Sequence, residues 1–241
     1  MATTANVLNK KYVLSEIKKL TTTVSSFIFK SQDGASIDFT PGMFAMLMYK
    51  GDEGSVSRAF SIANPPPSDS LEFMIALIHG SLTSKLEKAK VGDVYYISAP
   101  YGQFKFDSDI AKKLLFLAGG TGLAPFMSML RLMRKNGLKA DCKLIYSVKH
   151  PDEIIAKKEL ESMAEDIGLE ASVTVTRPVE GGNWGGLTGH INAEMIKKCA
   201  SDCTERVSYI CGPPAFVKAL KDALLSLGVN EKEIHAEMWG E

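Results

Sequence analysis

The sequence predicts a two-domain protein, in which an antiparallel β-barrel over residues 1–109 precedes an α/β domain with a parallel sheet over residues 110–241. Two observations predict this fold. The first half carries short apolar or alternating segments separated by glycine- and proline-rich turns, which is the pattern of antiparallel strands. The second half alternates strand-like with helix-like segments, and this order builds a parallel sheet with helices on both faces.

Strands with one helix among them are expected in the first half. The strands are expected at residues 12–14, 26–29, 43–49, 59–63, 71–78 and 94–98. Turn signals separate these segments, among them Asp33-Gly34, Pro41-Gly42 and Pro65-Pro66-Pro67. The helix is expected at about residues 82–90.

Strands and helices are expected to alternate along the second half of the chain. The strands are expected at residues 114–118, 143–148, 171–176, 207–211 and 234–238. The helices are expected at residues 125–136, 154–167, 190–199 and 214–227. The strand segments are short continuous apolar runs, as in buried strands, and the helix segments have the apolar spacing of amphipathic helices.

The composition is that of an ordinary globular protein, with 45% hydrophobic and 23% charged residues. The 28 basic residues balance 28 acidic ones, which argues against non-specific nucleic-acid binding as the main activity. No apolar run is long enough to span a bilayer, and residues 1–6 lack the apolar core of a signal peptide. We therefore expect a cytoplasmic protein without a membrane span.

The four cysteines have none of the spacings typical of zinc ribbons, redox dithiols or ferredoxins. Cys199 and Cys203 are four residues apart, so on a helix they would share one face. Small residues packed on a helix face explain this pair better than a metal site does. We expect no metal on this chain, and any iron–sulfur centre in the electron path would belong to another protein.

A glycine-rich segment follows the first strand of the second half. The strand at residues 114–118 continues into Gly119-Gly120-Thr121-Gly122, and Pro125 lies at the start of the next helix. Glycines let backbone amides approach a phosphate, and a helix N-terminus adds unpaired N–H donors. The spacing is neither G-x-G-x-x-G nor a P-loop. The segment is therefore either a nucleotide-binding turn or a tight turn that binds nothing.

The segment Arg58-Ala59-Phe60-Ser61 has the pattern of a strand with an exposed cation. On a strand, Arg58 and Phe60 point to one face and Ser61 to the other. Such an arginine could bind a diphosphate while the ring lies against a flat cofactor. An ordinary strand with one charged residue fits the same four residues.

Taken in order along the chain, these two and four further segments resemble the ferredoxin–NADP reductase superfamily, and the resemblance covers nearly the whole sequence. The matching segments are residues 41–44, 58–61, 80–84, 100–104, 119–125 and 211–214. The resemblance implies a flavin-binding antiparallel barrel followed by a parallel nucleotide-binding domain, which agrees with the fold expected from the residue pattern.

The resemblance also implies roles for residues of the first half. Arg58 would pair with the flavin diphosphate, and Phe60 would stack on the flavin ring where the superfamily usually has tyrosine. Ser61 would hydrogen-bond near flavin N5, where hydride arrives. The remaining flavin contacts would come from Ala59, Gly80, Leu82, Thr83 and Ser84, with Thr83 and Ser84 binding the flavin phosphate through amides and hydroxyls.

In the second half the resemblance implies a nicotinamide-nucleotide site. Gly120, Thr121 and Gly122, with Pro125, would bind the diphosphate of the nucleotide. Cys211 would lie beside the reacting nicotinamide carbon. Gly212 and Pro213 would shape the floor of the nicotinamide pocket. Trp239 would either cover the flavin ring or fill a hydrophobic edge, and Glu237 would be either an acid near the flavin or a surface carboxylate. Arg177 or Lys149 would meet a 2′-phosphate if the nucleotide is NADPH.

The implied function is that of an NAD(P)H-dependent flavoprotein reductase. Its cofactors would be FAD in preference to FMN, and NADH or NADPH. Hydride would pass from NAD(P)H to FAD, and electrons would continue to a separate protein acceptor such as a ferredoxin or flavodoxin. The alternatives are a reductase of a small molecule, either free flavin or a quinone, and an electron-transfer subunit of a larger complex. Ser61, Cys211 and Glu237 are the expected catalytic residues.

Overall fold

The computed structural model describes residues 7–51, 54–106, 113–178 and 182–239. The chain forms two compact units, one of Met1–Phe106 with Ala124–Leu132 and one of Asp107–Leu123 with Met133–Glu241. The domain boundary expected between residues 109 and 110 lies outside the described residues.

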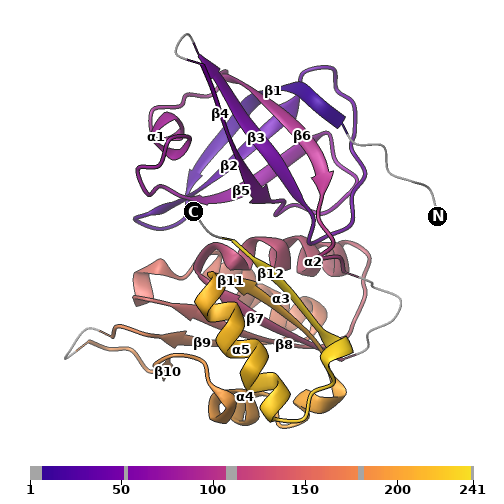
Figure 1. The fold of residues 1–241 in the computed structure, drawn as a ribbon, viewed down its shortest axis with the longest axis vertical. Coiled ribbons are helices and arrows are strands. Elements are labelled where there is room, and N and C mark those ends of the chain that lie inside the picture. The colour runs from indigo at the N-terminus through magenta and orange to yellow at the C-terminus, as the bar shows by residue number, and fades with distance from the viewer. Residues whose placement is uncertain (1–6, 52–53, 107–112, 179–181, 240–241) are drawn as a thin grey trace. The chain divides into compact units, whose positions relative to one another are not determined.

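The first unit contains an antiparallel sheet with the strand order β4-β3-β6-β1-β2-β5, as predicted (Figure 1). Its strands are β1 (Val7–Lys19), β2 (Val24–Ser31), β3 (Phe44–Gly51), β4 (Gly54–Ser61), β5 (Ser70–Ala76) and β6 (Val94–Tyr101). The strands β4 and β5 lie at the two ends of the sheet order, and they contact each other as the sheet curls into a barrel. The flavin-type segment therefore lies on an edge strand.

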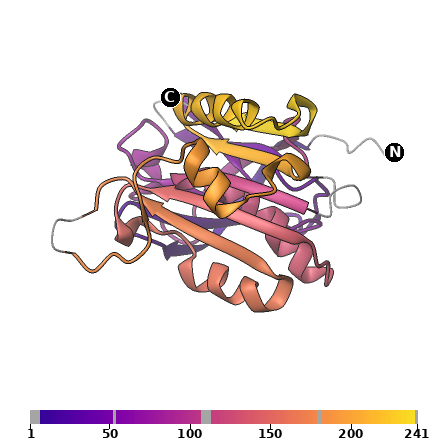
Figure 2. The ribbon, with the colours of Figure 1, turned by 90° about the horizontal axis from the view of Figure 1, so that it is seen from below.

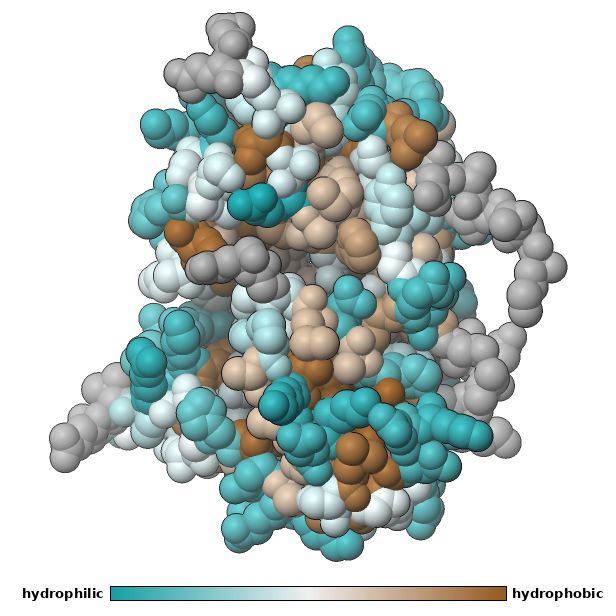
Figure 3. Space-filling view, in the orientation of Figure 1, coloured by the Kyte–Doolittle hydropathy of each residue, from teal (hydrophilic) through white to brown (hydrophobic). Residues whose placement is uncertain are grey.

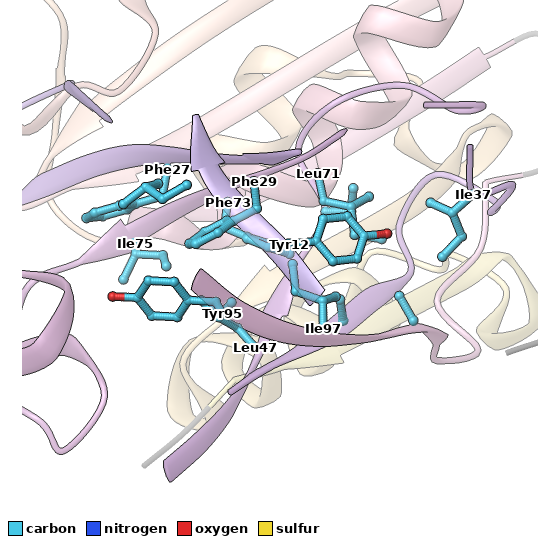
Figure 4. Close-up of a cluster of buried hydrophobic side chains, with 14 of the residues drawn as sticks. Tyr12, Phe27, Phe29, Ile37, Leu47, Leu71, Phe73, Ile75, Tyr95 and Ile97 are labelled. Atoms are coloured by element: carbon cyan, nitrogen blue, oxygen red, sulfur yellow. The ribbon is translucent and has the colours of Figure 1, made fainter. Parts of the chain in front are cut away.

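The interior of this unit is an aromatic and aliphatic core. Figure 4 shows the rings of Phe29, Phe73 and Tyr95 gathered between the strands. The Phe29 centroid lies 5.1 Å from that of Tyr95 and 5.9 Å from that of Phe73. Because side chains alternate along a strand, Phe27 and Phe29 of β2 are both buried, while Lys30 points outward.

The second unit contains a parallel sheet with the order β10-β9-β8-β7-β11-β12, again as predicted. Its strands are β7 (Lys113–Gly119), β8 (Asp141–Val148), β9 (Leu169–Val175), β10 (Leu187–Thr188), β11 (Val207–Gly212) and β12 (Ile234–Met238). The sequence did not predict β10, because two residues are too few to produce a periodic pattern.

Helices cover both faces of the parallel sheet. They are α3 (Lys157–Ile167), α4 (Ala193–Cys199) and α5 (Pro214–Ser226), while most of α2 (Ala124–Lys135) belongs to the first unit. Figure 2 shows α5 and α3 on opposite sides of the strands. Alternate residues of the strands supply the two cores: Leu115 and Leu117 of β7 pack with Ile196 of α4 and Leu220 of α5.

The first part of α2 packs with the barrel residues of the first unit. The guanidinium of Arg131 lies 2.7 Å from the Glu72 carboxylate and also donates to the carbonyl of Ala63. Ser128 donates to the carbonyl of Asn64 at 2.7 Å. These polar contacts attach the helix to the strand β5 and to the loop that precedes it.

Two local expectations are wrong. The helix α1 (Thr83–Leu86) is shorter than the predicted residues 82–90, because the chain turns after Leu86 and the Lys90 amide donates to the Asp93 carboxylate. Cys199 and Cys203 do not share a helix face. The helix α4 ends at Cys199, Ala200 leaves the helical conformation with φ −141° and ψ 75°, and Cys203 begins a separate 3₁₀ turn.

The surfaces of both units mix apolar and hydrophilic residues. On the face drawn in Figure 3, apolar atoms appear as separate patches among hydrophilic ones on each unit. None of the helices formed by the described residues is both long and apolar enough to cross a bilayer.

Candidate functional site

The flavin-type segment lies on β4, paired with β3 along its whole length. Arg58 is opposite the buried Leu47, and Phe60 is opposite the buried Ala45. Directly opposite residues share a face of the sheet, so Arg58 and Phe60 are on the inner face of an edge strand. The Phe60 centroid lies 6.2 Å from that of Phe73, so the core supports one side of the ring and leaves it half-exposed.

The Arg58 guanidinium is exposed, and its Nη1 donates only to the carbonyl of Ser57, at 3.3 Å. No carboxylate pairs with it among the residues that the structure describes. Ser61 is half-buried on the opposite face of β4, and Ala59 leaves room beside the strand without a large side chain. A cation without an acidic partner next to a half-exposed ring fits a flat cofactor with a diphosphate.

The hydroxyl group of Thr83 closes the turn at the start of α1. Thr83 is buried, its Oγ1 accepts from the Gly80 amide at 2.7 Å, and the Ser84 amide donates to the Gly80 carbonyl at 2.8 Å. Leu82 points into the barrel core. The Thr83 hydroxyl is therefore engaged in holding the turn, which leaves the half-buried Ser84 as the better hydroxyl for a phosphate.

The glycine-rich segment connects β7 to α2 through a 3₁₀ turn at Gly120–Leu123. Gly120 has φ +56°, a left-handed conformation that glycine adopts without strain. A Cβ on Gly122 would overlap the carbonyl oxygen of Cys211 and lie 2.7 Å from its carbon. The turn thus packs directly on the backbone of β11. The structure joins two motifs that are about ninety positions apart in the sequence, and only glycine allows this approach.

Thr121 is half-buried in this turn, and Pro125 is buried as the second residue of α2. Proline at that position loses no hydrogen bond, since the first amides of a helix have no internal partner. The segment therefore places small residues and the start of a helix at the carboxyl end of β7. In open parallel sheets this is the edge at which ligands bind.

Cys211 is fully buried on β11, between Ala118 of β7 and Glu237 of β12. Burial, with a smaller effect from the Glu237 carboxylate, raises the pKa of the Cys211 thiol. The group is therefore a neutral thiol at physiological pH. Burial also raises the pKa of the half-buried Glu237. The pair gives this edge of the sheet a neutral sulfur beside a carboxyl group that holds its proton more tightly than usual.

The aromatic residue Phe216 was missed by the sequence reasoning. Its ring lies under both glycine motifs: a Cβ on Gly212 would be 2.6 Å from Phe216 Cδ1, and one on Gly119 would be 3.3 Å away. Phe216 is the third residue of α5, and its position after Gly-Pro-Pro was the available signal. Pro213 is exposed before the helix. The Trp239 amide donates to the Gly212 carbonyl at 3.2 Å, and its side chain is 42% exposed.

Two cations lie at the carboxyl ends of β8 and β9. The Arg177 amide donates to the Lys149 carbonyl at 2.8 Å, so the two residues are neighbours, and both are exposed. The Lys149 amide in turn donates to the Glu153 carboxylate at 3.2 Å. Two exposed cations and one acid therefore lie close together at the carboxyl ends of β8 and β9.

Comparison with known proteins agrees with this arrangement. Residues 11–106 match the family of the oxidoreductase FAD-binding domain, and residues 116–222 match that of the oxidoreductase NAD-binding domain. The chain is 30% identical, over 99% of its length, to the glycine betaine monooxygenase reductase subunit of Pseudomonas aeruginosa, of which it covers 67%. It is 29% identical, over 93% of its length, to the toluate 1,2-dioxygenase electron transfer component of Pseudomonas putida, of which it covers 66%.

A solved structure shares the same fold. The flavohem-like FAD/NAD-binding domain of nitric oxide dioxygenase from Vibrio cholerae superposes with a TM-score of 0.88 at 20% identity, over 98% of this chain and 100% of that one. The chain spans about two thirds of the length of the two curated relatives. Their similarity therefore concerns the two nucleotide-binding units and leaves part of each relative unmatched.

Proposed function

Because the chain belongs to the ferredoxin–NADP reductase superfamily, we propose that it supplies electrons from NADH or NADPH, by way of FAD, to a separate redox protein. The chain is an NAD(P)H-dependent flavoprotein reductase. The proposed part is the acceptor. Two relatives are a monooxygenase reductase subunit and a dioxygenase electron transfer component, which supports a protein acceptor over a small molecule.

The observation that carries the proposed use of NADH or NADPH is the packing of Gly122 against the Cys211 carbonyl. A turn that binds nothing has no need to bring a phosphate-type loop and a buried neutral thiol to one edge of the sheet. A nucleotide site needs both, because the diphosphate and the nicotinamide of one molecule must be bound together.

FAD, when bound, supplies the conversion of a hydride into electrons that leave one at a time. The residues of the chain would bind and orient the two cofactors. Arg58 offsets the diphosphate charge, Phe60 supports the ring, and Ser61 offers a hydroxyl beside it. In the second unit the neutral Cys211 thiol would keep water from the nicotinamide pocket without adding charge, and Glu237 would place a carboxyl group, whose pKa is raised by burial, at the edge of that pocket.

All four cysteines are free thiols. Free thiols, three of them fully buried in the second unit, are the state expected in a reducing compartment. This supports the cytoplasm as the proposed location.

Anaerobic mixing tests the function directly. The purified protein, loaded with FAD, is expected to lose its flavin absorbance on addition of NADH or NADPH. The reduced protein is then mixed with an oxidised ferredoxin in one experiment and with a benzoquinone or free FMN in another. Faster reoxidation by the ferredoxin supports a protein acceptor. Flavin that stays oxidised with both nucleotides contradicts the reductase itself, and faster reoxidation by the small molecules contradicts the acceptor.

Nucleotide choice is expected to depend on Arg177. Arg177→Ala should raise the KM for NADPH by about tenfold, since a charged hydrogen bond contributes about 1.5–3 kcal/mol, and should leave the KM for NADH nearly unchanged. Steady-state reduction of ferricyanide with each nucleotide measures this. Arg134→Ala is the matched control, because Arg134 is an exposed arginine of the same unit that pairs with Asp166. Equal changes for both nucleotides would remove Arg177 from the site.

A further inference from the structure

The helix α2 holds the segment of chain that follows the flavin-type strand. The strand β4 ends at Ser61, and the carbonyl groups of Ala63 and Asn64 come just after it. Arg131 Nη1 donates to the Ala63 carbonyl at 3.0 Å, and Ser128 Oγ donates to the Asn64 carbonyl at 2.7 Å. The helix therefore binds the backbone directly after the serine that is expected beside the reacting atom of the flavin.

The Glu72 carboxylate fixes the guanidinium of Arg131 in this contact. Glu72 Oε2 lies 2.7 Å from Arg131 Nη1, and Glu72 Oε1 accepts from the Ser26 hydroxyl at 2.7 Å. The backbone of Glu72 pairs with the same segment, since its carbonyl accepts from the Ala63 amide at 2.9 Å. The Arg131 and Glu72 side chains are only 18% and 14% exposed, so solvent and salt screen this ion pair little.

Two apolar contacts attach the same part of α2 to the barrel unit independently of the ion pair. The Phe126 centroid lies 6.1 Å from that of Phe104. The Met129 side chain reaches the turn at Gly42, where an added Cβ would lie 2.9 Å from its Cε. Because Phe126 and Met129 are fully buried, loss of the ion pair should shift the helix on the barrel rather than release it.

The chain passes directly from the glycine-rich turn into this part of α2. The turn ends at Leu123, which belongs to the second unit, and Ala124 begins both α2 and the part of the helix that belongs to the first unit. One peptide bond therefore connects the turn that packs on the Cys211 carbonyl with the helix that binds the chain after β4. Since a helix moves as a rigid element, a shift of α2 on the barrel would displace the turn as well.

We propose that Arg131 is a positioning residue for flavin reduction, and that it sets the alignment of the nicotinamide with the flavin through α2. Arg131 acts through the Ala63 carbonyl on the side of the flavin and through the helix on the side of the nucleotide, and Glu72 orients it. This inference rests on the proposed binding of the flavin at β4 and of the nucleotide at the glycine-rich turn.

A loss of alignment has a distinct kinetic signature. A misplacement of about 1 Å between reacting atoms can lower a rate by up to about a hundredfold. The contacts that bind each cofactor stay in place, because β4 is paired with β3 along its length and the turn stays packed on β11. Removal of Arg131 should therefore slow the step in which NADH is oxidised to NAD⁺ and the flavin is reduced, without weakening the binding of either cofactor.

The test is the rate of flavin reduction by NADH in the full chain loaded with FAD, measured by anaerobic stopped-flow absorbance. For Arg131→Met we expect the limiting rate at saturating NADH to fall about tenfold. The half-saturating NADH concentration and the Kd of FAD should change less than about twofold. A residue with only a structural role would lower the resistance to urea and leave this limiting rate unchanged. Arg134→Met is the matched control, since it removes an exposed guanidinium from the last turn of the same helix and should leave all three constants unchanged.

Two further variants test the chemistry of the contact. Arg131→Lys should recover most of the limiting rate, because the bonds to Ala63 and Glu72 both come from one nitrogen and an ammonium group can supply both. Glu72→Gln removes the charge that fixes the guanidinium, while its amide oxygen can still accept from Ser26. It should lower the limiting rate by a smaller factor than Arg131→Met does, and it replaces that variant if Arg131→Met does not retain FAD.

Three outcomes would overturn the inference. An unchanged limiting rate in both Arg131→Met and Glu72→Gln would give the ion pair a structural role only. A raised half-saturating NADH concentration at an unchanged limiting rate would place Arg131 in nucleotide binding. An equal fall of the limiting rate in Arg134→Met would assign the effect to the charge of the helix. Failure of both NADH and NADPH to reduce the flavin of the unmodified protein would instead contradict the proposed function.

Discussion

Arg206→Met is expected to lower the free energy of unfolding of the second unit by about 3–5 kcal/mol, the usual cost of removing one partner from a buried ion pair. Arg206 is only 1% exposed. Its Nη2 lies 2.8 Å from Asp141 Oδ2, and its Nε lies 2.7 Å from Asp202 Oδ1. Its Nη1 also donates to the carbonyls of Asp141 and Leu114.

These contacts join three strands at the amino end of the parallel sheet. Leu114 is on β7, Asp141 begins β8, and Arg206 directly precedes β11. Methionine has a similar length and fills the space, but it leaves the Asp141 carboxylate and two carbonyl groups without the Arg206 donor, and it leaves Asp202 with Lys113 as its partner. The loss therefore comes from unpaired polar groups rather than from a void.

Urea unfolding followed by tryptophan fluorescence measures this loss. The chain has two tryptophans, Trp184 and Trp239, and both are in the second unit, so the signal reports that unit alone. Arg134→Met is the control. The Arg134–Asp166 pair is exposed and at 2.9 Å, so its removal should cost less than about 1 kcal/mol. Equal losses in the two variants would show that burial of Arg206 has no special effect.

The dependence of stability on pH is a second measurement of the contact between Arg206 and Asp202. Hydrogen bonding from Arg206 is the main cause that holds the pKa of Asp202 well below its usual value of 3.8. A carboxyl group with a lowered pKa stabilises the fold above its unfolded pKa, and this contribution is lost as the pH falls toward its folded pKa. The unmodified protein should therefore lose stability below about pH 4 by this route, and Arg206→Met should show a shallower loss.

Strand positions were predictable where one face of a strand is buried. In β2, the period of two that places Phe27 and Phe29 inside is visible in the sequence. The strand β4 was predicted too late, at residues 59–63 instead of Gly54–Ser61, because Val56 is the only apolar side chain among residues 54–58 and forms no pattern on its own. Pairing with β3 from Gly51 and Gly54 onward makes this segment a strand. Such pairing is a long-range effect that a local pattern does not contain.

The candidate site was predictable as a set of motifs and not as a set of contacts. Glycines and the arginine strand could be found because their residue types are unusual for their positions. The engagement of Thr83 with Gly80 and the ring of Phe216 under two glycines depend on distances between residues that the sequence alone does not give. The sequence predicts which segments contain the functional residues, and the structure shows which atoms of each segment are available to a ligand.

Gly122→Ala is expected to raise the NADH concentration needed for half-maximal flavin reduction by at least about tenfold, because a shift of about 1 Å in a binding group can cost up to a hundredfold. The added Cβ would overlap the Cys211 carbonyl, which is backbone within a sheet and cannot rotate away. The glycine turn must therefore move, and with it the amides proposed to bind the diphosphate. Stopped-flow reduction at varied NADH concentration measures the effect, and the flavin absorbance before mixing shows whether FAD is still bound.

Gly185→Ala is the control, since no atom lies within 4 Å of its Cβ position. If both alanine variants matched the unmodified protein, the approach of the turn to β11 would have no part in nucleotide binding, and the observation that carries the proposed function would lose its force.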